Sequence, residues 1–153
     1  MSQWLQIAQG LLTPLIAIAT VYIAWQQWNA TKLKMRIERY ERRLRVYQVT
    51  HRFISEVLSA NKPEITQIFG FYSDTAEADF IFPLRVRKYL DEIFYHANKL
   101  NLANTLYKPS EENSPEGYDH AEVCESLRLH TAWFNDQVSY AREVFKPYLD
   151  LSR

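Results

Sequence analysis

The sequence predicts an all-α protein, in which an N-terminal transmembrane helix continues into a cytoplasmic antiparallel bundle of three long helices and one short helix. Residues 1–31 contain no Asp, Glu, Lys, Arg or His, and no Gly or Pro occurs between Leu15 and Lys62. Further along the chain, apolar residues recur at alternating spacings of four and three, which is typical of helices that pack on other helices. We therefore expect a transmembrane helix over residues 1–30 and a cytoplasmic helical bundle over residues 31–153.

The predicted membrane span runs from Trp4 to Trp25. As a helix these 22 residues rise about 33 Å, close to the ~30 Å hydrocarbon core of a bilayer. Trp4 lies at one end, and Tyr22, Trp25 and Trp28 lie at the other, as in the aromatic belts of membrane proteins. A cleaved signal peptide fits less well because no charged region precedes the span. A buried core helix fits less well because 31 residues lack charge.

Positive charge follows the span directly. Residues 32–52, here called the basic collar, carry eight Lys or Arg side chains against Glu38 and Glu41, whereas residues 53–153 carry a net charge of −6. Because Lys and Arg resist translocation, the N-terminus is expected outside and the C-terminus in the cytoplasm. The collar should also attract anionic lipids, by roughly 1 kcal/mol per basic residue near the surface. The side chains predicted to contact lipid headgroups are Lys32, Lys34, Arg36, Arg39, Arg42 and Arg43.

One face of the predicted span is made of small and polar residues, here called the small-residue stripe. Small residues let helix backbones approach closely, and Thr and Gln can form hydrogen bonds between helices, so the stripe predicts self-association in the membrane. Chance is the alternative, because Ala and Thr are common in such helices. A pore would be a further step, since the stripe has no charge. Its members are Gln6, Gly10, Thr13, Ala17, Thr20, Ala24 and Gln27.

Beyond the span, the first long helix should continue to about residue 60. Asn61 is expected to cap a short helix over Pro63–Tyr72, with Glu64 completing a capping box. Its predicted core seam is Leu33, Ile37, Tyr40, Leu44, Tyr47, His51, Ile54 and Leu58.

Two further long helices are predicted. Phe80 to Phe82 should form an extended apolar plug, because Pro83 disfavours helical geometry at the residue before it. The helix that Pro83 begins should bury a seam of Val86, Leu90, Ile93, Ala97 and Leu100. An exposed loop is expected over residues 108–117. The last helix should begin with Asp119 as its cap and end near Phe145, and its expected seam is Cys124, Leu127, Thr131, Phe134, Val138, Ala141, Phe145 and Tyr148.

Residues that could carry chemistry are few. Arg45 and His51 are the only catalytic candidates that we retain, although positions six apart on a regular helix point about 120° away from each other. His51 is expected on the seam as a buried, hydrogen-bonded histidine, His130 is expected at the surface, and Cys124 is expected to pack in the core. No cluster suggests a metal or another cofactor, and the collar's place beside a bilayer favours lipid over nucleic acid as its partner.

The segments VYIAWQQWNATKLKMRIERYERRLRVY and FKPYLDL resemble a widespread type of small bacterial membrane protein with one N-terminal span and a cytoplasmic helical domain. That resemblance implies the inner membrane as the location, but no activity. In layout the chain is also similar to the single-span accessory proteins of RNA-targeting CRISPR systems, which join a membrane helix to a HEPN-like domain. Arg45 and His51 match the Arg-x4-6-His signature of HEPN ribonucleases, in which two protomers form the site.

The leading functional expectation is a homo-oligomeric, non-enzymatic membrane protein that acts as an effector or accessory, with antiviral defence as its most concrete version. One alternative is a membrane-tethered ribonuclease that uses Arg45 and His51. Another is a monomeric tether whose acidic bundle binds a basic cytoplasmic protein partner.

Overall fold

The computed structural model describes residues 2–109 and 117–150, with side chains from residue 14 onward. These residues form helices joined by turns, without a strand among them, so the predicted all-α class is confirmed. They divide into two compact units, which we call the N-terminal unit (Met1–Arg39) and the bundle unit (Tyr40–Arg153). The elements are α1 (Ser2–Ala60), α2 (Ile65–Asp74), α3 (Ala78–Ile81), α4 (Leu84–Leu106), α5 (His120–Phe145) and the 3-10 helix η2 (Lys146–Tyr148).

The N-terminal unit is a single stretch of α1, which continues through Pro14 without a break. The prediction of one uninterrupted helix up to residue 60 is therefore confirmed. Every side chain described between residues 14 and 39 is exposed, including Ile18 at 68% and Val21 at 69%. Among the described residues, no helix has the length and apolar character needed to cross a bilayer. Residues 4–13 of the predicted span, with Gln6, Gly10 and Thr13 of the stripe, lie outside the described side chains.

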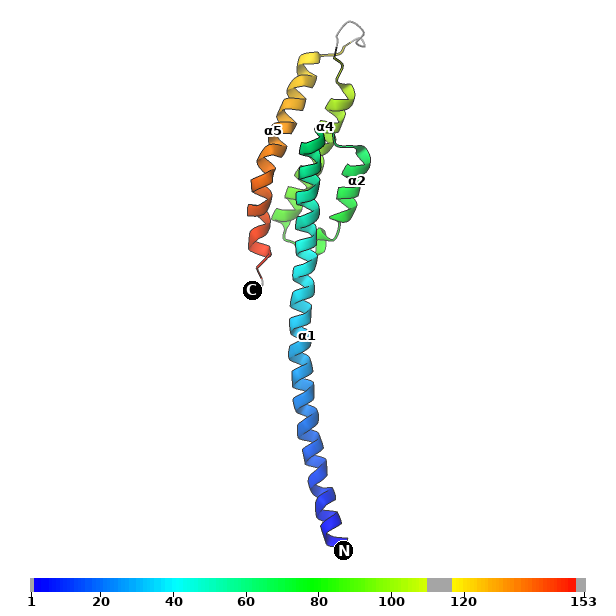
Figure 1. The fold of residues 1–153 in the computed structure, drawn as a ribbon, viewed down its shortest axis with the longest axis vertical. Helices are drawn as coiled ribbons and strands as arrows, with labels where there is room; N and C mark the ends of the chain where they lie inside the picture. The colour runs from blue at the N-terminus through cyan, green and yellow to red at the C-terminus, as the bar shows by residue number, and fades with distance from the viewer. Residues whose placement is uncertain (1, 110–116, 151–153) are drawn as a thin grey trace. The chain divides into compact units, whose positions relative to one another are not determined.

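In the bundle unit four helical segments alternate in direction. The last part of α1 and α4 run one way, whereas α2 and α5 run the other (Figure 1). Phe53 of α1 stacks on Phe71 of α2, with ring centroids 4.5 Å apart, and also meets the edge of Phe134 of α5. Tyr47 of α1 contacts Phe145. These rings join the helices into one hydrophobic core, which is why the predicted antiparallel bundle is correct in outline.

The core seam of α1 differs from the predicted one. Its most buried residues are Val46, Thr50, Phe53, Ile54 and Val57. The predicted members Leu33, Ile37 and His51 are instead exposed. The true seam is displaced by about one residue. It includes Thr50, which is buried and whose hydroxyl donates to the Val46 carbonyl at 2.8 Å. A polar residue that finds its hydrogen bond within the helix is not visible to a hydrophobic pattern.

The caps between α1 and α2 also differ from expectation. Asn61 has a φ of 54° and its N–H donates to the Val57 carbonyl, so it ends α1 and does not cap α2. A left-handed Asn after a helix satisfies one of the terminal carbonyls that lack a partner. Glu64 is the true N-cap, and it forms a capping box with Gln67. The short helix is therefore displaced by two residues, to Ile65–Asp74.

The predicted extended plug before α4 is wrong for two of its three residues. Phe80 and Ile81 belong to the one-turn helix α3, and Phe80 is 90% exposed. Only Phe82 is both extended and buried, as Pro83 demands of the residue before it. Pro83 itself is the N-cap of α4 and not part of its first turn.

The long helices α4 and α5 agree with prediction to different degrees. All five predicted seam residues of α4 are buried, together with Tyr89 and Ala103. At the start of α5, the Asp119 carboxylate accepts from the Glu122 N–H at 3.1 Å, and the helix ends at Phe145 as predicted. Its seam is only partly right, because Val138 is exposed whereas the buried residues are His130, Phe134, Gln137, Ala141, Val144 and Phe145. Most of the predicted 108–117 loop lies outside the described residues.

Candidate functional site

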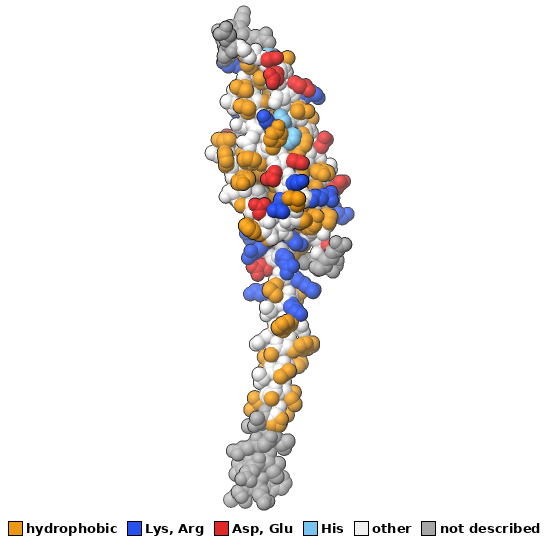
Figure 2. Space-filling model, turned by 180° about the vertical axis from the view of Figure 1, so that it is seen from behind, with side chains coloured by type: hydrophobic (Ala, Val, Ile, Leu, Met, Phe, Trp, Pro, Cys, Tyr) orange, Lys and Arg blue, Asp and Glu red, His pale blue; other side chains and the backbone are white. Residues whose placement is uncertain are grey.

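The described part of the N-terminal unit is an uncovered apolar helix surface that ends at basic residues. Figure 2 shows hydrophobic side chains without charged ones along the described start of α1, followed by Lys and Arg side chains. Trp28 marks the change, because Lys32 Nζ lies 5.0 Å from its ring centroid. The remaining large apolar side chains that are more than half exposed before the collar are Leu15, Ile16, Ile18, Val21, Tyr22, Ile23 and Trp25.

The six predicted headgroup contacts fall into different environments. Five of them are exposed on the helix, namely Lys32, Lys34, Arg36, Arg39 and Arg42. Arg43 is instead half-buried in the bundle unit, where Nε donates to the Ile81 carbonyl at 3.2 Å and Nη1 to the Tyr148 carbonyl at 3.3 Å. Arg43 therefore ties α3 and η2 to α1, a role in the bundle that the sequence pattern did not indicate.

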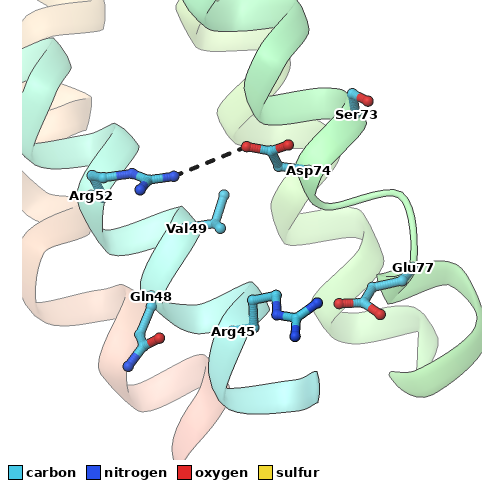
Figure 3. Close-up of a pocket in the computed structure, with 7 residues that line it drawn as sticks. All are labelled: Arg45, Gln48, Val49, Arg52, Ser73, Asp74 and Glu77. Carbon is cyan, nitrogen blue, oxygen red and sulfur yellow. Dashed lines mark ion pairs between the residues drawn. The ribbon is translucent and has the colours of Figure 1, made fainter. Parts of the chain in front are cut away.

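A polar groove of about 610 Å³ opens between α1 and the end of α2 (Figure 3). Arg52 lies between two carboxylates, at 3.9 Å from Glu56 and 4.0 Å from Asp74, so its charge is largely compensated. Because these side chains are exposed, such pairs add little stability. The lining residues are Arg45, Gln48, Val49, Arg52, Ser73, Asp74 and Glu77.

The two catalytic candidates do not meet within one chain. Arg45 lines the groove, with its guanidinium directed toward the side of Glu77 in Figure 3. His51 is exposed, does not line the groove, and has Tyr47 as its ring neighbour at 6.0 Å. The expectation of a buried His51 is wrong, because the seam displacement in α1 turns this residue outward. Cleavage of RNA through these two residues stays a prediction from sequence alone.

A histidine pair joins α4 to α5. His96 Nδ1 and His130 Nδ1 are 2.8 Å apart, and the His96 ring stacks on Trp133 with centroids 3.9 Å apart and planes 2° from parallel. His130 is only 6% exposed, so its expected surface position is wrong. Burial, and then the neighbouring His130, lower the pKa of His96. Burial, and then Lys99, lower the pKa of His130.

A second set of polar contacts lies at the start of α5. His120 Nδ1 and the Tyr118 hydroxyl are 3.1 Å apart, and His120 Nε2 is 3.4 Å from the Cys124 sulfur. Tyr118 also accepts from the Lys108 N–H at 3.2 Å. These contacts tie the beginning of α5 to the end of α4. Cys124 is half-buried beside them and is not one of the core residues, so its expected packing in the core stays a prediction.

Sequence reasoning missed the histidine pair because its members are 34 residues apart. The signal that could have found them is the α4–α5 antiparallel register, which places position 96 opposite position 130. Within the described residues, no group of three or more His, Cys, Asp or Glu side chains is arranged to hold a metal ion. No protein family model, curated protein or solved structure matches this chain.

Proposed function

We propose that this chain is a membrane-anchored, homo-oligomeric protein whose N-terminal helix crosses the bilayer and whose helical bundle serves as a non-enzymatic effector or accessory on the cytoplasmic side. The observation that carries the proposal is the uncovered apolar surface of the N-terminal unit. Between residues 14 and 31 large apolar side chains are more than half exposed, and no charged group accompanies them. Apolar surface of this extent on a soluble chain costs about 25 cal/mol for each Å² left in water.

Backbone geometry supports a bilayer as the cover. All residues of this segment belong to one helix, so the peptide groups form their hydrogen bonds within the segment, as hydrocarbon demands. The hydroxyl of Thr20 is likewise satisfied, because it donates to the Ile16 carbonyl at 2.7 Å. The helix thus offers lipid few unpaired donors along the described residues.

The transition from Trp25 and Trp28 to Lys32 supports a membrane boundary there. Indole rings favour the headgroup region, and lysine beyond them extends toward anionic lipid. The exposed Lys34, Arg36 and Arg39 continue this basic surface. Their charge is also the argument for a cytoplasmic bundle, since it opposes translocation.

Self-association is supported by the described half of the small-residue stripe. Ala17, Thr20 and Ala24 are exposed and occupy one face of α1. In hydrocarbon, helices associate through close packing of such faces because no hydrophobic force drives them together. We propose assembly as the basis of the activity because the described residues of the small-residue stripe are exposed for it, whereas Arg45 and His51 do not meet within one chain. A conducting pore and a role in antiviral defence stay predictions.

The experiment compares two identical substitutions on different faces of α1. Positions 17 and 19 are 200° apart around a helix, so Ala17→Leu adds bulk to the stripe whereas Ala19→Leu adds it elsewhere. Mass photometry of the full chain in mild detergent should give a defined oligomer for the wild type and for Ala19→Leu. Ala17→Leu should shift the distribution toward monomer.

Two results would contradict this proposal. A wild-type chain that is monomeric at all detergent ratios has no membrane oligomer to disrupt. Equal dissociation of Ala17→Leu and Ala19→Leu would show that the stripe does not define the contact. In either case a tether that binds a cytoplasmic protein would become the better account.

A further inference from the structure

We propose that His96 and His130 form a proton-sensitive joint between α4 and α5, closed by one N–H···N hydrogen bond and opened when the accepting nitrogen binds a proton. The two Nδ1 atoms lie 2.8 Å apart, within the range of an N–H···N hydrogen bond. Two lone pairs at that distance would repel, as would two N–H groups. The contact therefore requires that one ring donates and the other accepts.

The ring geometry favours a proton over a metal ion as the shared group. The ring centroids are 4.9 Å apart, about 2 Å more than the nitrogens, so each Nδ1 lies at the near end of its ring and the rings meet almost end to end. A metal would instead lie off the line between the nitrogens, at about 2.0 Å from each. No third ligand joins the pair among the described residues.

The protonation states of the two rings show which added proton breaks the hydrogen bond. When both imidazoles are neutral, the donor ring carries its proton on Nδ1 and keeps a free lone pair on Nε2. The first added proton can bind at that Nε2, which leaves the Nδ1–H donor in place. The next must bind at the accepting Nδ1, where it removes the acceptor and places two cationic rings in contact.

The groups around the pair also oppose positive charge. Tyr95 of α4 contacts both rings, and Lys99 Nζ lies 5.6 Å from the Tyr95 ring. On α5, Arg128 is two residues before His130, so it points to another side of the helix, where it pairs with Glu125 at 2.7 Å. From the core side, Phe134 next to Trp133 contacts the apolar Phe53 of α1. The neighbours of the pair thus supply a cation and neutral rings.

The direction of the pH effect follows from the lowered pKa of both histidines. Their causes are burial first, then His130 for His96 and Lys99 for His130. A histidine whose pKa is lower in the folded chain than its unfolded value of about 6.5 binds more protons on unfolding. Its contribution to stability is therefore complete above that value, and it is lost as the pH falls through the folded pKa.

The experiment measures urea unfolding of the full chain in detergent micelles between pH 7.5 and pH 5, by circular dichroism. The test variants are His96→Asn and His130→Asn, singly and together, because the Asn amide reaches the position of Nδ1 without titrating. His51→Asn is the matched control, since His51 is an exposed histidine on another face.

In the wild type, the unfolding equilibrium constant should rise as the pH falls, by roughly tenfold per pH unit for each extra proton that the unfolded chain binds. The double Asn variant should lose that part of the slope, and His51→Asn should retain the wild-type slope. Equal slopes for the wild type and the double variant would overturn the joint.

A second measurement needs no substitution. Nitrogen-detected NMR of ¹⁵N-histidine in the wild type should show two imidazoles that titrate in two coupled steps below the ordinary histidine range. Two independent titrations near 6.5 would overturn the proposal. So would a loss of stability at pH 7.5 when EDTA is added, because that result would identify a metal and not a proton between the rings.

Discussion

The two units of this chain dispose of their apolar side chains in opposite ways. In the bundle unit, Val46, Ile93 and Phe134 are fully buried against neighbouring helices. In the described part of the N-terminal unit, Leu15, Ile18 and Val21 are more than half exposed. Both regions are helical, so helix formation does not separate them. They differ in what covers the apolar surface, which is protein in the bundle unit and, under our proposal, lipid in the N-terminal unit.

This contrast explains the distribution of charge along the chain. Protein cover lets a helix keep a polar face toward water, so the bundle helices carry acidic and basic residues on their outer faces. Under our proposal lipid surrounds the N-terminal helix, which then needs no such face, and residues 1–31 contain no Asp, Glu, Lys, Arg or His. The basic collar begins at Lys32, directly after this segment without charged residues.

The largest expected effect comes from removing a ring from the protein-covered region. Phe134→Ala should lower the free energy of unfolding by about 3–5 kcal/mol, because a fully buried phenyl group leaves a cavity. Phe80→Ala is the matched control, since Phe80 is 90% exposed and its loss should change stability by less than about 0.5 kcal/mol. Urea unfolding of both variants provides the test, and equal losses would contradict the core described above.

A smaller effect separates lipid cover from exposure to water. Ile18 and Leu129 are similarly exposed, at 68% and 52%, in different units. Ile18→Lys should weaken membrane insertion by roughly 3–4 kcal/mol, because an apolar side chain is lost and a lysine near the bilayer centre is costly. Leu129→Lys should leave insertion unchanged. Partition between membrane and soluble fractions gives the comparison, and an Ile18→Lys chain that stays fully in the membrane would refute lipid cover at this position.

The smallest expected effect concerns the catalytic candidates. Both Arg45 and His51 are exposed, so the Arg45→Ala/His51→Ala variant should differ in stability by less than about 0.5 kcal/mol. Under the non-enzymatic proposal, neither the wild type nor this variant should degrade RNA above the level of a mock purification. Cleavage by the wild type alone would establish the ribonuclease alternative and displace the proposal.

The regions also differ in how well their structure could be predicted from sequence. All five residues predicted for the α4 seam are buried, because this helix packs against α2, α3 and α5 and its buried positions are nearly all apolar. The seams of α1 and α5 were displaced where Thr50, His130 and Gln137 are buried. Each has a hydrogen bond that lowers the cost of burial, such as that from the Thr50 hydroxyl to the Val46 carbonyl at 2.8 Å. A pattern of apolar residues does not show which polar side chains find a hydrogen-bond partner in the fold.

The same limit applied to the candidate sites. The basic collar could be found from sequence because its residues are close along the chain. The histidine pair could not, because its two rings meet only through the α4–α5 register. Arg43 was assigned to lipid from its charge alone, whereas its half-buried guanidinium contacts two carbonyls in the bundle unit. The charge of an arginine suggests that it binds anionic groups, but its position in the fold decides which groups it can reach.

The most direct test of lipid cover is flotation of the full wild-type chain with vesicles of mixed anionic and zwitterionic lipid after detergent is removed. The account predicts that the chain floats with the vesicles and stays with them through a high-salt and alkaline wash. Salt and alkali strip proteins held only by charge, but not a helix that spans the bilayer. A chain that remains in solution without detergent and does not float would contradict the account.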